Sequence, residues 1–310
     1  MINPRKSIAT ALTALCLAAA PAFAGGEGWT HDYEAAKTQA AEEKKDMLLD
    51  FTGSDWCGWC IKLVNEVFSK DAFKAYADEN LVLVELDFPR DKSKVSDETR
   101  AQNNKLKDEF GIRGYPTIYL TDAQGRPYAR TGYQRGGPEA YIKHLEELKA
   151  KRVERDQHMA AADKAEGVAK AKHLHAAMQA LGDEMATQHY KPTVKEIIAL
   201  DANNEAGLKK HYEDIEVAKE QRKDIEAAMR SAQADPEGAI KKLDELAAGE
   251  ATVPAIKQEA LALKSRIQLI LVKDKPAAKA TLLQAIEVDP ESETAKMLKQ
   301  VLKQVFSDDA

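Results

Sequence analysis

The chain of 310 residues is poor in cysteine, in aromatic side chains and in long apolar segments. Its three cysteines are too few for the disulfide framework that holds small secreted domains together. No stretch approaches the ~20 consecutive apolar residues that a membrane-spanning helix needs. The net charge of −6, without a basic patch, argues against general nucleic-acid binding. What remains, at 44% hydrophobic and 31% charged residues, is the composition of a globular protein with room for two domains.

The N-terminus has the pattern of a secretory signal peptide. Two basic residues precede the apolar stretch Ile8–Ala20, and the small residues Ala22 and Ala24 form an A-x-A cleavage pattern. We expect residues 1–24 to be removed, which makes the product an exported protein, periplasmic or extracellular, with no stable membrane insertion. The alternative is a disordered or buried apolar N-terminus.

Cleavage after Ala24 would also remove Cys16, so that only Cys57 and Cys60 remain. An exported protein with two cysteines, separated by two residues, can form only that one internal bridge.

The composition changes near residue 150. All three tryptophans precede it, whereas the rest of the chain is rich in Ala, Lys, Glu and Gln. This change indicates a sheet-containing domain over residues 25–150 and a helical domain over residues 151–310.

Helical and strand patterns alternate in the first domain. The segments that we assign, in chain order, are a helix over His31–Lys45, a strand over Met47–Phe51, a helix over Cys57–Tyr76, a strand over Leu81–Leu86, a charged segment Arg90–Lys107 ending in a helix, a strand over Thr117–Leu120, a turn into a fourth strand at Asp122–Gly125, and a helix over Pro138–Lys149. This order predicts a mixed α/β sheet that is flanked by helices.

The second domain reads as helices separated by similar breaks. These breaks are Leu200–Asn204, Ala234–Glu237 and Val288–Glu291. The first two are 34 residues apart, which is the tetratricopeptide period, but the third fits no multiple of that period. We therefore keep two interpretations, a degenerate tetratricopeptide-like array and an irregular helical bundle.

The motif Trp56-Cys57-Gly58-Trp59-Cys60 carries the chemistry. Its spacing brings both sulfurs to the first turn of a helix, where unpaired N–H groups and the helix dipole stabilise a thiolate at Cys57. Cys57 is thus the candidate nucleophile and Cys60 the candidate resolving cysteine. Such a pair can also be half of a zinc site. Since no second pair exists and the nearest histidines are His31 and His144, we expect no metal.

A second motif, Gly111–Thr117, precedes the third strand and contains Tyr115-Pro116-Thr117. With the W-C-x-x-C motif, it makes residues 29–149 resemble the thioredoxin superfamily. The resemblance implies a thioredoxin-like fold in which Pro116 is cis and faces the cysteine pair, leaving the backbone of Tyr115 to bind an extended substrate. The alternative is an ordinary trans proline before a strand.

The resemblance also implies a role for Asp50, because in this family a buried carboxylate before the active-site helix moves the resolving cysteine's proton. Two departures weaken the match. Six residues separate Asp50 from Cys57, one more than in ordinary thioredoxins, and Glu85 stands where many relatives carry a lysine. The alternative is an aspartate that caps the loop.

Trp56 and Trp59 are candidate substrate-binding residues beside the first thiol, or simply packed aromatic side chains. Trp59 matches neither the proline of reducing thioredoxins nor the histidine of oxidising relatives, so the motif does not indicate the direction of electron flow.

Together these observations predict an exported thiol–disulfide oxidoreductase, which acts on protein thiols and disulfides with a redox partner protein and without a cofactor. The helical domain would bind a protein partner, and nucleic acid is not expected as a partner. Two alternatives remain: a non-catalytic scaffold with a structural Cys57–Cys60 bridge, and a peroxide-reducing enzyme, for which no motif speaks.

Overall fold

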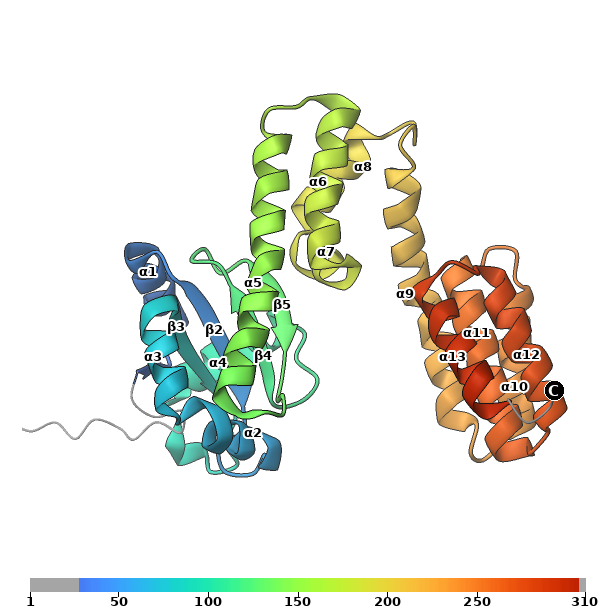
Figure 1. Cartoon of the computed structure of the whole chain (residues 1–310), viewed down its shortest axis with the longest axis horizontal. Coiled ribbons are helices and arrows are strands. Elements are labelled where there is room, and N and C mark those ends of the chain that lie inside the picture. The colour runs from blue at the N-terminus through green and yellow to red at the C-terminus, as the bar shows by residue number, and fades with distance from the viewer. Residues whose placement is uncertain (1–27, 307–310) are drawn as a thin grey trace, which may run out of the picture. The chain divides into compact units, whose positions relative to one another are not determined.

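A computed structural model describes residues 28–306, which form two compact units separated between Val153 and Glu154 (Figure 1). We call residues 28–153 the sheet unit and residues 154–306 the helical unit. The expected signal peptide, residues 1–24, lies outside the described residues. Within the described range, no helix combines the length and the apolar character needed to cross a bilayer.

The sheet unit contains the alternating strands and helices that the sequence predicts. In chain order they are β1 (Trp29–Thr30), α1 (Tyr33–Glu43), β2 (Asp46–Thr52), α2 (Gly58–Leu63), the π-helical turn η1 (Val64–Phe68), α3 (Asp71–Asn80), β3 (Leu81–Asp87), the 3-10 turn η2 (Lys92–Lys94), α4 (Asp97–Glu109), β4 (Thr117–Thr121), β5 (Pro127–Thr131) and α5 (Gly137–Ala162).

The strands form one mixed sheet in the order β1-β3-β2-β4-β5. β1 and β2 run parallel to β3, while β4 is antiparallel to both β2 and β5. The predicted mixed α/β sheet flanked by helices is confirmed. The short edge strand β1 is additional, because two residues give no detectable alternation.

Helices cover both faces of this sheet. The ring of Phe51 in β2 lies 5.6 Å from that of Phe110, directly after α4. The neighbouring residue Asp50 must point to the opposite face, where its charge acts on Tyr141 of α5. All residues of β2 and β3 are accordingly buried.

The prediction of one helix over Cys57–Tyr76 is wrong in one respect, because the observed helix is not continuous. It passes through the π turn, breaks at Lys70, whose backbone is extended, and restarts as α3. Phe68 and Phe73 explain the break. Both are buried and their rings lie 4.8 Å apart, whereas positions five apart on a regular helix point in different directions.

The helical unit consists of the end of α5 and a series of further helices. These are α6 (Gly167–Leu181), α7 (Asp183–His189), α8 (Lys191–Leu200), α9 (Leu208–Ser231), α10 (Pro236–Ala248), α11 (Pro254–Ile267), the π-helical turn η3 (Gln268–Val272), α12 (Lys275–Val288) and α13 (Glu293–Val305). The predicted largely helical region is confirmed, and each of the three breaks falls between helices.

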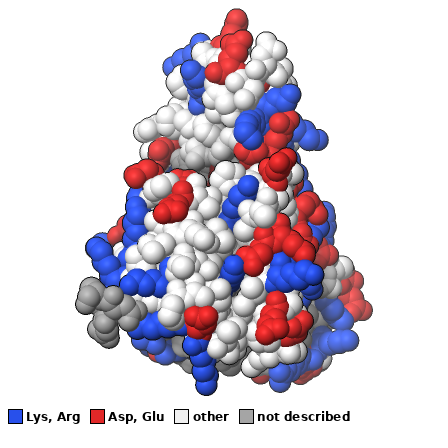
Figure 2. All heavy atoms as spheres, turned by 90° about the vertical axis from the view of Figure 1, so that its right-hand side faces the viewer, with Lys and Arg blue, Asp and Glu red and all other residues white. Residues whose placement is uncertain are grey.

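Its surface carries helical ion pairs such as Lys210–Asp214 and Lys241–Glu245. On the face that Figure 2 presents, basic and acidic side chains are interspersed. Such pairs contribute little stability individually, so burial of apolar residues must hold the unit together. One such cluster is formed by residues of α9, α10 and α11, among them Ile225, Leu243 and Ile256.

Candidate active site

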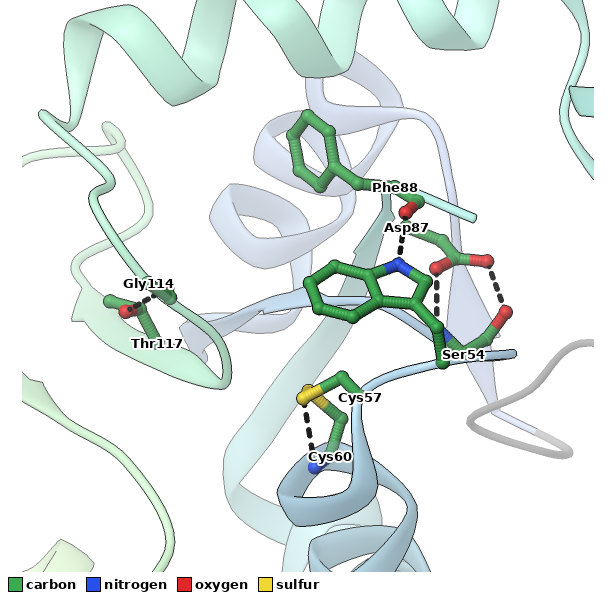
Figure 3. Close-up of a disulfide and its surroundings, with 8 residues drawn as sticks. Ser54, Cys57, Cys60, Asp87, Phe88, Gly114 and Thr117 are labelled. Atoms are coloured by element: carbon green, nitrogen blue, oxygen red, sulfur yellow. Dashed lines mark hydrogen bonds between the residues drawn. A yellow bond between two sulfur atoms is a disulfide. The ribbon is translucent and has the colours of Figure 1, made fainter. Parts of the chain in front are cut away.

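Cys57 and Cys60 lie at the start of α2 and form a disulfide, with their Cα atoms 5.2 Å apart (Figure 3). Cys57 is the N-cap residue, and its Sγ accepts a hydrogen bond from the backbone N–H of Cys60 at 3.2 Å. Cys57 is 6% exposed and Cys60 only 2%. The first sulfur therefore accepts one N–H group at a helix start, where a thiolate is favoured, while the second sulfur is the more buried of the two.

A hydrogen-bonded loop positions Cys57. Asp87, at the end of β3, accepts hydrogen bonds from the Ser54 N–H at 2.9 Å and from the Ser54 hydroxyl at 2.6 Å. The Cys57 N–H donates to the carbonyl of Gly53 at 2.9 Å. These contacts tie the loop between β2 and α2 to the neighbouring strand.

Trp56 packs against Gly53 of this loop, and its indole N–H donates to the Phe88 carbonyl at 2.9 Å. A Cβ atom at Gly53 would lie 2.6 Å from the indole, so that only glycine allows this close approach. Trp56 is still 38% exposed. Its ring meets that of Tyr115 edge to face at 5.7 Å.

The loop that carries Pro116 lies beside the loop of the cysteines. The Tyr115–Pro116 peptide bond is cis, in agreement with the family resemblance. Thr117 pairs with Phe51, so Pro116 lies at the end of β2 from which the chain continues to Cys57. Together with the contact between Tyr115 and Trp56, this register brings Tyr115 and Pro116 beside the loop that carries the cysteines.

Trp59 forms a second aromatic contact on the other side of the motif. It is 53% exposed and lies 5.2 Å from the ring of Tyr133. Lys62 Nζ is 5.2 Å from each of these two ring centres, and the Tyr133 hydroxyl donates to Glu66 at 2.5 Å. The motif thus presents two exposed indole rings, which lie against the half-buried rings of Tyr115 and Tyr133.

Asp50 is buried on the face of the sheet that α5 covers. Burial, and then the neighbouring carboxyl groups of Glu85 and Asp87, raise the pKa of Asp50 well above its ordinary value. Within the part of the chain that the structure describes, Asp50 Oδ1 has no hydrogen-bond partner.

Sequence reasoning missed Ser54, Asp87, Phe88 and Tyr133, which hold or extend the site. Their contacts join positions that lie 32 to 74 residues apart in the sequence, and no local sequence pattern predicts these contacts. The polar residue Asp87 after an apolar strand was the one available signal.

Comparison with known proteins agrees with this geometry. The family model of the thioredoxin-like domain matches residues 33–149. The chain is 37% identical over 122 residues to the disulfide bond reductase DsbH of Chlamydia pneumoniae, covering 39% of this chain and 72% of that protein. It is 30% identical over 131 residues to the thioredoxin-related protein DsbJ of the same organism, covering 41% of this chain and 37% of DsbJ. A solved structure of a DsbH oxidoreductase matches with 32% identity and a TM-score of 0.37, covering 46% of this chain and 94% of that one.

The chain therefore belongs to the thioredoxin-like family. It is a thiol–disulfide oxidoreductase whose substrates and redox partners are protein thiols and disulfides. These relatives favour exchange chemistry over a purely structural Cys57–Cys60 bridge.

Proposed function

We propose that this protein is an exported disulfide reductase in which Cys57 attacks the substrate and Cys60 releases it. One observation carries the assignment of roles: Cys57 caps α2 and its sulfur accepts the N–H of Cys60, whereas Cys60 is almost fully buried. The direction is supported by the relative that is named a disulfide bond reductase.

The reaction begins when the Cys57 thiolate attacks one sulfur of a substrate disulfide. A mixed disulfide forms, and the other substrate sulfur leaves as a thiolate. Cys60 then loses its proton to the Asp50 carboxylate and attacks the sulfur of Cys57, which releases the second substrate thiolate. Two electrons pass to the substrate, the Cys57–Cys60 disulfide forms, and a partner dithiol reduces it again.

The exposed aromatic residues would hold the substrate during these steps. We assign Trp56, Trp59, Tyr115 and Pro116 to substrate binding, because they border the disulfide and two of them are exposed large apolar side chains. The backbone of Tyr115 would pair with an extended segment of the substrate.

We also propose that residues 1–24 direct export to the periplasm, with cleavage after Ala24, and that the helical unit is a tetratricopeptide-like surface for a protein partner. The N-terminal charge and apolar pattern supports the first point. Exposed apolar residues one turn apart on α13, Met297 and Val301, support the second. Mass spectrometry of the protein recovered from cells tests the cleavage site directly.

Two cysteine variants test the catalytic proposal. Cys60→Ser should accumulate a covalent mixed disulfide with oxidised insulin, visible by non-reducing electrophoresis, whereas Cys57→Ser should trap nothing and lose insulin reduction. Trapping by Cys57→Ser instead would reverse the two roles.

The direction is tested by the potential of the Cys57–Cys60 couple against glutathione. We expect a value near that of thioredoxin, about −270 mV. A potential near the oxidising end of the thioredoxin superfamily, about −120 mV, would contradict a reductase.

A further inference from the structure

Asp50 and Glu85 are two buried carboxyl groups at matching positions of neighbouring strands. The register of the parallel strands β2 and β3 pairs Asp50 directly with Glu85. Paired residues of adjacent strands point to the same face, and the strands lie about 4.8 Å apart. Both side chains are only 2% exposed. The two carboxyl groups therefore lie side by side, shielded from water.

His31, from the segment between β1 and α1, faces Glu85. Its Nδ1 lies 3.0 Å from the Glu85 main-chain oxygen, and its Nε2 lies 3.5 Å from the Glu85 carboxyl oxygen Oε2. A carbonyl oxygen can only accept, so Nδ1 carries the hydrogen of this contact. Nε2 is then directed to the carboxyl group, where a protonated His31 is an ionic partner for an ionised Glu85.

Among the described residues, the charged groups that act on Asp50 are both acids, Glu85 and Asp87. Asp87 lies further along β3, and its two oxygens are occupied by Ser54. From α5 comes the uncharged phenol of Tyr141. The ionised form of Asp50 is therefore opposed by burial and by two acids.

We propose that Glu85 is a positioning residue for the redox reaction: its carboxylate, fixed beside Asp50 by the strand register and by His31, makes Asp50 a stronger base for the proton of Cys60. The inference rests on the proposed function, in which that proton moves from the Cys60 sulfur to the Asp50 carboxylate. A carboxylate is normally far too weak a base for a thiol, and transfer is most efficient when the two proton affinities are similar. Repulsion from Glu85 reduces that mismatch, whereas a cation at the same position would increase it.

The experiment is a pH titration of the Asp50 carboxyl carbon by ¹³C nuclear magnetic resonance on the intact disulfide form, with Asp50→Asn to assign the signal. Glu85→Gln keeps the shape but removes the charge, so the midpoint of Asp50 should fall by roughly one pH unit or more. Glu85→Asp keeps the charge and should retain most of the elevation.

Asp46→Asn is the matched control. Asp46 is a buried carboxylate on the same strand, but its partners are Arg152 and Tyr128, and it is not among the groups that raise the pKa of Asp50. Its loss should weaken the fold without moving the midpoint of Asp50. The kinetic counterpart is the resolving step, measured as release of substrate from a preformed mixed disulfide, whose pH profile should move downward with Glu85→Gln.

An unchanged Asp50 midpoint in Glu85→Gln would overturn the inference. If Glu85→Gln does not fold, the titration of the unaltered protein still tests the inference. Coupling between the two carboxyl groups requires the Asp50 signal to change also at the pH where Glu85 ionises. A single-step titration of Asp50 would contradict the coupling. The titration needs neither substrate nor turnover, so an unshifted midpoint in an active reductase would refute this inference alone.

Discussion

Asp50 in the sheet unit and Asp201 in the helical unit are both almost completely buried, and the two side chains behave in opposite ways. Asp50, in β2, is 2% exposed and Asp201, after α8, is 1% exposed. Hydrogen bonds from the N–H groups of Ala206 and Leu208 hold the pKa of Asp201 below its usual value, whereas burial beside other acids raises that of Asp50.

The comparison shows that burial alone does not define the role of an acid. A carboxylate whose oxygens are filled by backbone N–H groups organises a loop and the start of a helix, here that of α9. A carboxyl group that is buried beside other acids has a raised pKa, which is the property that the proposed proton transfer from Cys60 requires. Four substitutions can break or sharpen this contrast.

Asp201→Ala should have the largest effect, a loss of about 2–3 kcal/mol in the helical unit, because it leaves buried N–H groups without an acceptor. Since the pKa of Asp201 is lowered in the folded protein, its contribution is present above the unfolded pKa of about 3.8 and disappears as the pH falls below it. Urea unfolding followed by circular dichroism, with hydrogen exchange to locate the change, measures both. An equal loss at every pH would contradict the assignment.

Asp50→Asn should act in the opposite direction and stabilise the sheet unit at neutral pH. Asp50 ionises near pH 3.8 in the unfolded chain, but only at a higher pH in the folded protein, because its folded pKa is raised. The unaltered protein therefore loses stability as the pH rises from about 3.8 towards the folded pKa. The variant should equal the unaltered protein at pH 3 and exceed it at pH 7. Its insulin reduction should nonetheless be slower, since the proposed base is gone.

His189→Gln tests pH dependence inside the helical unit. Burial lowers the pKa of His189 from 6.5 to about 4. Between pH 6.5 and about 4, the His189 side chain binds a proton in the unfolded chain but not in the folded unit. The unaltered unit therefore loses stability as the pH falls through this range. We expect a loss of at most about 2 kcal/mol after allowance for solvent screening, and the variant should not show it. Thermal unfolding at pH 7, 5.5 and 4.5 provides the measurement.

Ser54→Ala should give the smallest change, about 1 kcal/mol in the sheet unit, through loss of the hydroxyl donated to Asp87. The backbone N–H of residue 54 keeps its own bond to Asp87, which limits the damage. Ser54→Thr retains the hydroxyl and serves as the control. A loss of the same size in Ser54→Thr would show that packing, not this hydrogen bond, is responsible.

The sequence predicted features that arise from nearby residues. Apolar runs such as Leu81–Leu86 specify buried strands, and the spacing of Cys57 and Cys60 brings their sulfurs together within one turn. The family resemblance added Pro116 and Asp50, which no local pattern would have connected to the cysteines.

Features that depend on contacts between distant residues escaped prediction. The break of the helix at Lys70 follows from the joint burial of Phe68 and Phe73. The contact between Trp59 and Tyr133 requires β5 to end beside the active-site helix. Neither can be read from one segment. The exact end of α5, thirteen residues beyond the expected Lys149, likewise depends on packing and not on a helix-breaking residue.

The placement of the three tryptophans has a practical consequence for studies of this protein. Trp29, Trp56 and Trp59 all belong to the sheet unit, and the last two border the disulfide. Indole emission thus comes from the sheet unit. Tryptophan fluorescence of the intact chain can therefore follow the sheet unit, without labels and without separating the two units.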